Sequence, residues 1–211
     1  MTEKNIIPFF TTSVMQIQLD LDLEKLTELA FQMQNKDKKG APPFANRGGW
    51  TSNNIKEEKH EELIRLKKEI TQHLQTYQSE VFQEMEFKGN VVHNIEGIWT
   101  NINEKYHYND WHIHDFSTLS GVYYVKHDGS TENGDILFKH PLAEYMTTCH
   151  WPQNIVETFN MVTASCITVT PKSNMLLIFP SWLKHKVEAN LKDDTRISSA
   201  FNSIPLVEKK S

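Results

Sequence analysis

The N-terminal part of the chain carries apolar side chains at helical spacing. In residues 19–34 the apolar positions recur every three or four residues, and Asp22 lies where the side chain of an N-cap residue is expected. A second helix is expected to start at Asn53 or Asn54, where Glu57 would complete a capping box, and its apolar stripe of the same period runs from Leu63 to Val81. Because charged residues surround both stripes, we expect two amphipathic helices that each bury one face.

After residue 90 the pattern changes to short runs of β-branched and aromatic residues, separated by turn-forming residues. Six strands are expected: Ile95–Ile102, Leu119–Val125, Ile136–Phe138, Phe159–Val169, Met175–Phe179 and Arg196–Asn202. Many short strands are typical of a sandwich or barrel. Helices that precede the strands favour a mainly β core braced by N-terminal α-helices on one face.

No shift in composition divides the chain, so we expect a single domain over residues 1–211. Residues 1–90 would form a strand and helix layer, and residues 91–205 the β core. The longest unbroken apolar run, Met175–Phe179, is far shorter than the about 20 residues of a membrane helix. The N-terminus has no basic start followed by an apolar stretch, so we expect no signal peptide and a cytoplasmic location.

Charge argues against nucleic acid as a partner. Lys and Arg number 22 against 27 Asp and Glu, which gives a net charge of −5, and no basic face is evident along the sequence. The two cysteines, Cys149 and Cys166, lack metal-binding spacing and are expected to be free thiols. Histidine is the residue that stands out, with ten copies.

Three histidines supply the candidate chemistry. His112 and His114 are two residues apart, which places both imidazoles on the same side of an extended chain. They can therefore ligate one metal ion. His185, which follows an apolar strand and a Pro-Ser turn, is the candidate third ligand. Imidazole suits iron, copper, nickel and zinc, and three protein ligands leave coordination positions open for chemistry.

A second candidate group follows His185 in the sequence. Arg196 and Ser198 alternate onto the same face of an expected strand. A buried arginine beside a hydroxyl can bind a carboxylate through its planar fork of donors. The competing interpretation of Arg196 is a surface arginine near the acidic turn Asp193–Asp194.

Together these motifs resemble the 2OG-Fe(II) oxygenase family known from phages and marine bacteria, within the superfamily of iron(II)- and 2-oxoglutarate-dependent dioxygenases. The resemblance extends from residue 46 to residue 202 and so covers most of the chain. The segments that carry it are Asn46–Ser52, His112–His114, Leu119–Val125, Gly134–Phe138, Leu177–Val187 and Arg196–Asn202.

The resemblance implies a double-stranded β-helix, a jelly-roll and cupin-like barrel with the metal in its mouth. It implies iron(II) as the metal, with 2-oxoglutarate and O2 as cosubstrates, and hydroxylation of a C–H bond with release of succinate and CO2. Arg196 would then pair with the distal carboxylate of 2-oxoglutarate, and Ser198 would add a hydrogen bond. Tyr124 would present its phenol to the same carboxylate, although a core aromatic is the competing interpretation.

One position departs from the superfamily pattern of His-x-Asp or His-x-Glu, because His114 stands where the acid is expected. An all-histidine triad is the first interpretation, in which Asp115 would orient a ligand imidazole instead. In the second, Asp115 supplies the third ligand, which requires a bulge after the strand. In the third, the position stays open, which the bulk of His114 argues against.

Other functional classes compete with an oxygenase. A non-catalytic, cupin-like metal-binding or ligand-binding module would explain His114 in the acid position, and a structural protein would need no metal. The sequence leaves the substrate open among a peptide, an amino acid, a nucleobase and another small metabolite, and it does not determine the oligomeric state. Asn46–Ser52 and Lys139–Asn160 are candidate segments over the pocket, and Asn101 and Asn202 are candidate lining residues.

Overall fold

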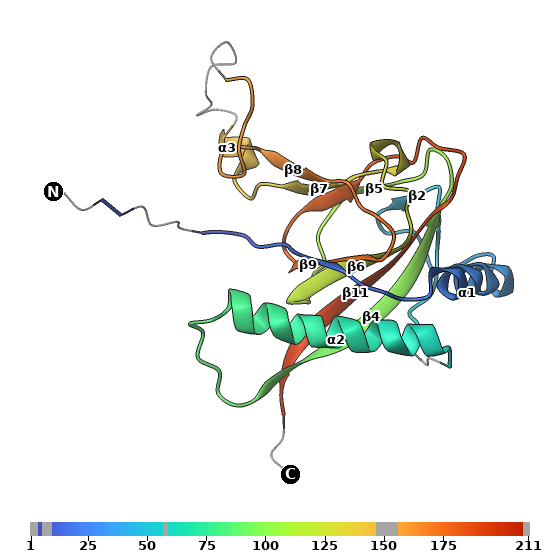
Figure 1. The fold of residues 1–211 in the computed structure, drawn as a ribbon, viewed down its shortest axis with the longest axis horizontal. Coiled ribbons are helices and arrows are strands. Elements are labelled where there is room, and N and C mark those ends of the chain that lie inside the picture. The colour runs from blue at the N-terminus through green and yellow to red at the C-terminus, as the bar shows by residue number, and fades with distance from the viewer. Residues whose placement is uncertain (1–3, 6–9, 57–58, 147–155, 209–211) are drawn as a thin grey trace.

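Two antiparallel sheets face each other and form the β core (Figure 1). The computed structural model describes the chain except residues 1–3, 6–9, 57–58, 147–155 and 209–211. The larger sheet contains, in spatial order, β1 (Met15–Gln18), β9 (Met175–Pro180), β6 (Leu119–Lys126), β11 (Arg196–Val207), β4 (Val91–Asn103) and β3 (Trp50–Thr51). The smaller sheet contains β2 (Asn46–Arg47), β5 (Tyr108–His112), β10 (His185–Val187), β7 (Ile136–Lys139) and β8 (Cys166–Val169).

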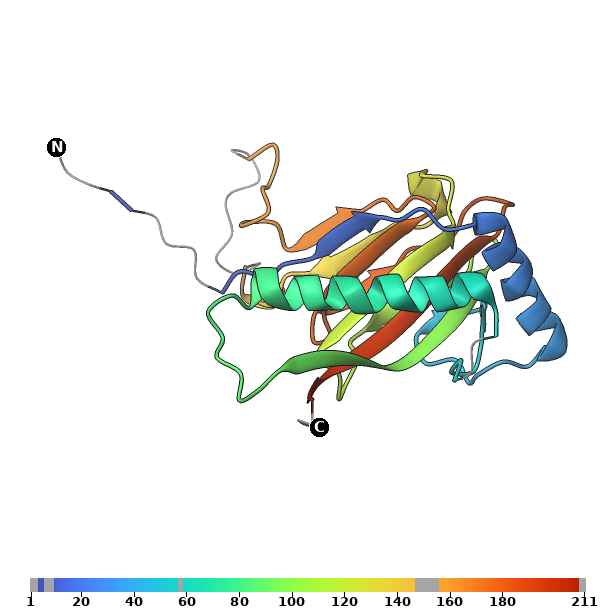
Figure 2. The same ribbon diagram turned by 60° about the horizontal axis from the view of Figure 1, so that its bottom comes forward.

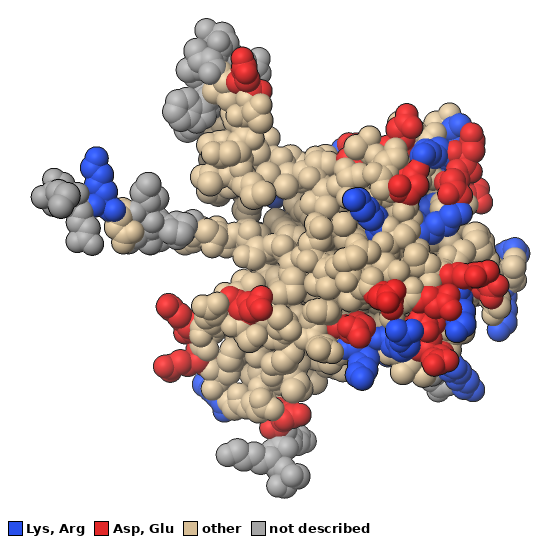
Figure 3. Space-filling view, in the orientation of Figure 1, with Lys and Arg blue, Asp and Glu red and all other residues tan. Residues whose placement is uncertain are grey.

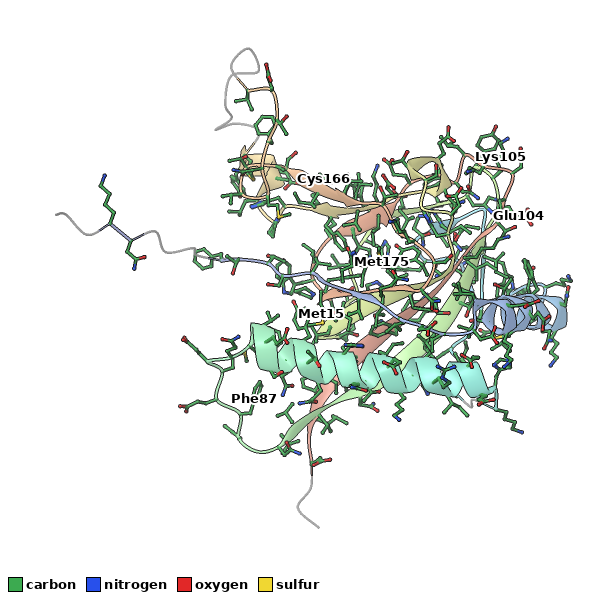
Figure 4. The ribbon with its side chains drawn as sticks, viewed as in Figure 1. Met15, Phe87, Glu104, Lys105, Cys166 and Met175 are labelled. Carbon is green, nitrogen blue, oxygen red and sulfur yellow. The ribbon has the colours of Figure 1, made fainter. Side chains whose placement is uncertain are left out.

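The order of the strands is that of a jelly roll. Consecutive strands from β4 to β7, and again from β8 to β11, alternate between the two sheets. At the edge of the larger sheet, β1, which begins at Met15, pairs antiparallel with β9, which begins at Met175 (Figure 4). The expected double-stranded β-helix is therefore confirmed.

Helices cover the outer face of the larger sheet. α2 (Glu61–Val81) lies across its strands, and α1 (Leu23–Lys36) lies at one end (Figure 2). The stripe of α2 that packs on the sheet is fully buried and consists of Leu66, Ile70, Leu74 and Tyr77. The expected brace of helices on one face is confirmed, since these side chains form one hydrophobic cluster with the strands. The remaining described helices are short, η1 (Thr131–Asn133) and α3 (Ala143–Met146).

Side chains of consecutive residues on the central strands lie on opposite faces of the larger sheet. Tyr123 belongs to the cluster under the helices, whereas Tyr124 belongs to the cluster between the sheets. On β11, Ile197 and Phe201 likewise pack under the helices, while Ser198 lines a cavity between the sheets. This alternation follows from the pleat of a strand. The outer face of the sheet therefore builds the larger hydrophobic cluster, whereas the inner face combines a smaller cluster with a cavity.

The expected strand Phe159–Val169 is wrong over most of its length, because only Cys166–Val169 forms β8. The side chain of Asn160 accepts hydrogen bonds from the backbone N–H groups of Val162 and Thr163. Such a local hydrogen bond stabilises a turn in place of a strand. The other five expected strands are present, and each is longer than expected.

The expected start of the second helix is also wrong. α2 begins at Glu61, well after Asn53 and Asn54. The Asn54 side chain instead accepts a hydrogen bond from the N–H of Ile98 and donates one to the carbonyl of Glu96, so it binds this segment to β4. In α1 the expected cap is confirmed, since Asp22 accepts a hydrogen bond from the N–H of Lys25 at 3.1 Å. The helix itself begins at Leu23, because the residues before the cap continue the extended chain of β1.

Among the described residues, no helix has both the length and the hydropathy needed to cross a membrane. Acidic and basic side chains intermingle on the face drawn in Figure 3, and neither sign forms a separate patch there.

The α2 interface gives a direct test of this packing. Ile70 is 0% exposed and Ile64, on the same helix, is 51% exposed. We expect Ile70→Ala to lower the free energy of unfolding by about 2–5 kcal/mol, because it leaves a cavity in the core. The matched Ile64→Ala should lower it by less than about 1 kcal/mol. Urea unfolding measures both values, and equal losses would contradict the packing of α2.

Candidate functional site

Three histidines meet where two neighbouring inner strands of the smaller sheet, β5 and β10, end and begin. β5 ends at His112, β10 begins at His185, and the antiparallel register places these two residues opposite each other. His114 follows β5, and its backbone N–H donates to the carbonyl of Ser181 at 3.0 Å, which holds it beside the start of β10. One potential ligand atom from each imidazole lies within 4.8 Å of the others. This spacing can hold a metal ion.

Backbone carbonyls select the tautomer of two of these imidazoles. His112 Nδ1 lies 2.7 Å from the carbonyl oxygen of Asp110, and His185 Nδ1 lies 2.8 Å from that of Leu183. A carbonyl only accepts hydrogen bonds, so each Nδ1 carries the proton and donates it. Nε2 is then the nitrogen with a free lone pair, which is the form that ligates metals.

Burial keeps all three imidazoles neutral. It lowers the pKa of His112, and it lowers the pKa of His185 well below the ordinary value, with the neighbouring histidines adding to the effect on His185. Burial, together with the nearby His112, lowers the pKa of His114 to about 4. Metal ligation requires the deprotonated imidazole, so the cluster is held in the ligating state at neutral pH.

Asp115 is not part of this cluster. It is exposed, and the group of ligand atoms that lie together consists of His112, His114 and His185. The next residue, Phe116, has a positive φ of 63° and is 97% exposed. The chain therefore turns toward solvent directly after His114.

A cavity of about 60 Å³ runs from the histidines into the space between the sheets, and we call it the inner chamber. Its far end is formed by Tyr124 on β6 and by Arg196 and Ser198 on β11. Tyr124 and Ser198 are directly opposite each other in the register. These three side chains and the three histidines line the same chamber.

Arg196 is a buried cation without a carboxylate partner among the described residues. It is 1% exposed, and its Nη1 donates to the carbonyl oxygens of Asn133, Gly134 and Glu188 at 3.1 to 3.4 Å. Burial lowers its pKa to about 10, so the guanidinium stays charged at neutral pH. A buried charge without a counterion is destabilising, so this geometry favours an anionic ligand.

Gly134 makes room for that guanidinium. Its φ is 95°, and a Cβ at this position would collide with Arg196 Nη1 and the carbonyl oxygen of Glu188. Only glycine combines this backbone conformation with such a close approach.

Tyr124 adds a further polar group at this end of the chamber. Its hydroxyl is buried and has no hydrogen-bond partner among the described residues. Burial raises the pKa of Tyr124, so the phenol keeps its proton and can donate it to an acceptor. The hydroxyl and the guanidinium therefore offer donors to the same end of the inner chamber.

A wider cavity of about 340 Å³ adjoins the histidines on the other side, and we call it the outer chamber. Its lining includes His112 and His114 as well as Trp99, Asn101 and Asn202. Phe44 also lines it, is 75% exposed, and makes an edge contact with the His112 ring at a centroid distance of 6.2 Å. Trp99 and Phe44 were not among the expected site residues, because nothing in their local sequence pattern marks them as such.

Of the two segments that the sequence suggests as covers of the pocket, only one lines a chamber in the described part of the chain. The segment Asn46–Ser52 contributes Asn46, Thr51 and Ser52 to the outer chamber. The described part of Lys139–Asn160 contributes to neither chamber, and its residues Lys139–Pro141 line a separate apolar groove. The middle of that segment lies outside the described residues.

Comparison with known proteins agrees with this geometry. The family model described as "Putative 2OG-Fe(II) oxygenase" matches residues 97–202, half of the chain, and this range includes the three histidines, Tyr124, Arg196 and Ser198. The chain therefore belongs to this family of iron(II)- and 2-oxoglutarate-dependent oxygenases. No curated protein matches the chain.

Solved structures share the fold. A prolyl-4-hydroxylase from Pseudomonas putida is 15% identical, with a TM-score of 0.59 over 92% of this chain and 94% of that one. A viral collagen prolyl hydroxylase from Paramecium bursaria Chlorella virus-1, in complex with 2-oxoglutarate, is 12% identical, with a TM-score of 0.56 over 90% of this chain and 94% of that one. HygX from Streptomyces hygroscopicus, with nickel and 2-oxoglutarate bound, is 11% identical, with a TM-score of 0.55 over 92% of this chain and 84% of that one.

The residues present fit the two groups that the family uses. Three neutral imidazoles are suitable ligands for a divalent first-row metal. Among the described residues, the guanidinium of Arg196 has no carboxylate partner and the hydroxyl of Tyr124 has no hydrogen-bond partner, so both suit a carboxylate at the other end of the inner chamber.

The neutral imidazoles predict how stability depends on pH in metal-free protein. An unfolded histidine has a pKa near 6.5 and takes up a proton below that pH, whereas the folded cluster resists protonation down to about pH 4 at His114. The unfolded state therefore binds more protons, and the free energy of unfolding should fall as pH is lowered from about 6.5 to about 4.

Urea unfolding in the presence of a chelator, repeated across this pH range, measures the effect. His114→Phe should flatten part of the fall, while the buried His93 and His127, whose pKa values burial also lowers, account for another part. Ile64→Phe on the exposed face of α2 is the matched control, because it introduces the same ring without removing a titratable group, and it should keep the wild-type profile. An unchanged profile in His114→Phe would show that His114 is not held neutral by the cluster.

Proposed function

We propose that this protein is an iron(II)- and 2-oxoglutarate-dependent oxygenase that hydroxylates a C–H bond of a small molecule or a peptide. One observation carries the proposal. A single chamber has three neutral imidazoles at one end and, at the other, a buried guanidinium that lacks a carboxylate partner among the described residues. A keto acid with a distal carboxylate can span such a chamber between a metal and a fixed cation.

In this proposal His112, His114 and His185 hold iron(II). Arg196 binds the distal carboxylate of 2-oxoglutarate, and Tyr124 and Ser198 donate hydrogen bonds to it. The carbonyls that accept from Arg196 Nη1 support this role, because they hold the guanidinium in one orientation. Membership of the oxygenase family supports the choice of metal and cosubstrate.

The proposed third ligand is His114 and not Asp115. The position of His114 within 4.8 Å of both other ligand atoms supports it, as does the exposure of Asp115 outside the cluster. Three neutral ligands leave the whole charge of the metal to be balanced by what binds next to it. Two carboxylates of 2-oxoglutarate, one near the metal and one at Arg196, would match the two positive ends of the chamber.

When bound, iron(II) with 2-oxoglutarate and O2 supplies the oxidising chemistry, with succinate and CO2 as products. The chain's own residues position and shield these groups. Val122, Ile136 and Phe179 form apolar walls of the inner chamber, so they exclude water from the space between the histidines and Arg196.

Spectroscopy and product analysis test the proposal. Anaerobic addition of iron(II) and then 2-oxoglutarate should produce a broad visible charge-transfer band that needs both additions, and O2 should then yield succinate. His185→Ala should lose the band, because one of three ligands is removed, while His73→Ala on α2 should keep it. Stoichiometric metal binding without a band in the wild type would overturn the proposal.

Arg196 provides a quantitative prediction. Arg196→Lys keeps the charge but loses the planar fork, and hydrogen bonds to charged groups contribute about 1.5–3 kcal/mol. We therefore expect the 2-oxoglutarate concentration for half-maximal band intensity to rise by about 10- to 100-fold. Arg65→Lys, at the ion pair that the half-exposed Arg65 makes with the buried Glu62 on α2, is the control and should leave that concentration unchanged. An unchanged value in Arg196→Lys would show that Arg196 does not bind the cosubstrate.

A non-catalytic metal-binding or ligand-binding module is the second candidate function, and His114 in place of the usual acid is the observation that favours it. This candidate predicts metal binding without succinate, whatever compounds are offered as substrate. Succinate formed in proportion to O2 consumed would exclude it.

A further inference from the structure

The outer chamber adjoins the candidate metal ligands and carries no charged side chain among its described lining residues. A molecule in this chamber would lie beside His112 and His114, where a substrate of the proposed reaction must be. The inner chamber differs from it, since Arg196 is a cation at its far end. Close to the outer chamber, Arg47 and Asp110 are exposed and lie 3.6 Å from each other, so their charges are paired.

Asn101 faces this chamber with a free donor. Asn46 Nδ2 donates to Thr51 Oγ1 at 2.9 Å, and Thr51 Oγ1 lies 2.9 Å from Asn101 Oδ1. Asn46 Nδ2 can only donate, and it also donates to the carbonyl of Trp50, which sets its orientation. The Thr51 hydroxyl must therefore donate to Asn101 Oδ1. Asn101 Nδ2 is left without a hydrogen-bond partner in the described part of the chain, although Asn101 is only 7% exposed.

Asn202 repeats this arrangement on the neighbouring strand. Its Oδ1 accepts a hydrogen bond from Ser120 Oγ at 2.8 Å, and Ser120 Oγ also lies 2.8 Å from Ser181 Oγ. Within the described ranges, Asn202 Nδ2 has no hydrogen-bond partner either. β4 and β11 are adjacent in the larger sheet, so two amide donors reach the same chamber from neighbouring strands.

The geometry points to an uncharged peptide segment as the occupant of the outer chamber, with its backbone carbonyls accepting hydrogen bonds from Asn101 and Asn202. This inference rests on the proposed function, because it identifies what the oxygenase would hydroxylate. Amide donors match carbonyl acceptors, whereas a phosphate or a carboxylate would call for a cation that the chamber lacks.

The remaining walls suit the side chains of a peptide. Trp99 lines the chamber beside the His114 ring, and Phe44 is largely exposed at the same cavity. Aromatic surfaces of this kind pack against apolar groups. Because Phe44 and Pro42 are exposed lining residues, the chamber opens to solvent, and a chain can enter and leave it.

Nuclear magnetic resonance tests the inference without turnover. The probes are capped tripeptides with neutral side chains, the same tripeptides with a central Asp or Lys, and neutral nucleosides, each titrated into protein labelled on asparagine. We expect the neutral tripeptides to shift the side-chain amide resonances of Asn101 and Asn202 in a saturable manner. The charged tripeptides and the nucleosides should bind at least tenfold more weakly.

Matched variants assign the effect to the donors. Asn202→Asp replaces the donor amide with a carboxylate and should weaken neutral tripeptide binding at least tenfold. Asn94→Asp makes the same change at an exposed position of β4 and should leave the dissociation constant unchanged. If Asn202→Asp does not fold, Asn202→Ser removes the donor with less perturbation and should show the same direction of change.

Three results would overturn the inference. These are no saturable binding of any neutral tripeptide, equal binding by Asn202→Asp and the wild type, or preference for nucleosides or charged peptides at these resonances. The titration is run with and without zinc(II) and 2-oxoglutarate, and it needs no O2. Loss of the iron and 2-oxoglutarate band alone would therefore overturn the proposed function, and the peptide titration would be judged separately.

Discussion

Alternation of side chains across the larger sheet is the constraint on which the rest of this structure depends. On β6, β11 and β4, one residue packs under α2 and the next one faces the space between the sheets, as Tyr123 and Tyr124 do. A slip of one residue in register would place Arg196 under the helices and Ile197 in the chamber. Burial of the apolar face against α2 therefore also determines where the polar face of the site lies.

The polar side chains on that inner face have the character of a binding site. Among the residues that the structure describes, the buried donors of Arg196 meet only backbone carbonyls and the buried hydroxyl of Tyr124 meets no partner, and burial of such groups lowers the stability of a fold. The three imidazoles are crowded and neutral for the same physical reason, which is removal from water. Buried donors and imidazoles of this kind are typical of a binding site, where a ligand supplies their hydrogen-bond or coordination partners. Here they lie at the two ends of the inner chamber.

The two chambers differ in the charge of the side chains that line them. The inner one combines a cation with neutral imidazoles and suits a small dianion together with a metal, whereas the outer one offers amide donors and aromatic surface. Asn101 lines both of them, and its orientation is determined by Thr51 and Asn46 in the segment that precedes α2. The N-terminal layer thus does more than brace the sheet, because it orients a side chain next to the candidate metal ligands.

Much of this arrangement was accessible from the sequence. The spacing of His112 and His114, the alternation of Arg196 with Ser198, and five of six strands follow from periodicity, which is local. The start of α2, the placement of Phe44 and Trp99 beside the outer chamber, and the orientation of the Asn101 amide were decided only by tertiary structure. Asn54, for example, binds β4 through residues more than forty positions away, and its capping tendency loses to those hydrogen bonds. The face on which a residue lies follows from the spacing of its sequence neighbours. Which of several possible hydrogen-bond partners a side chain uses depends on residues that become its neighbours only when the chain folds.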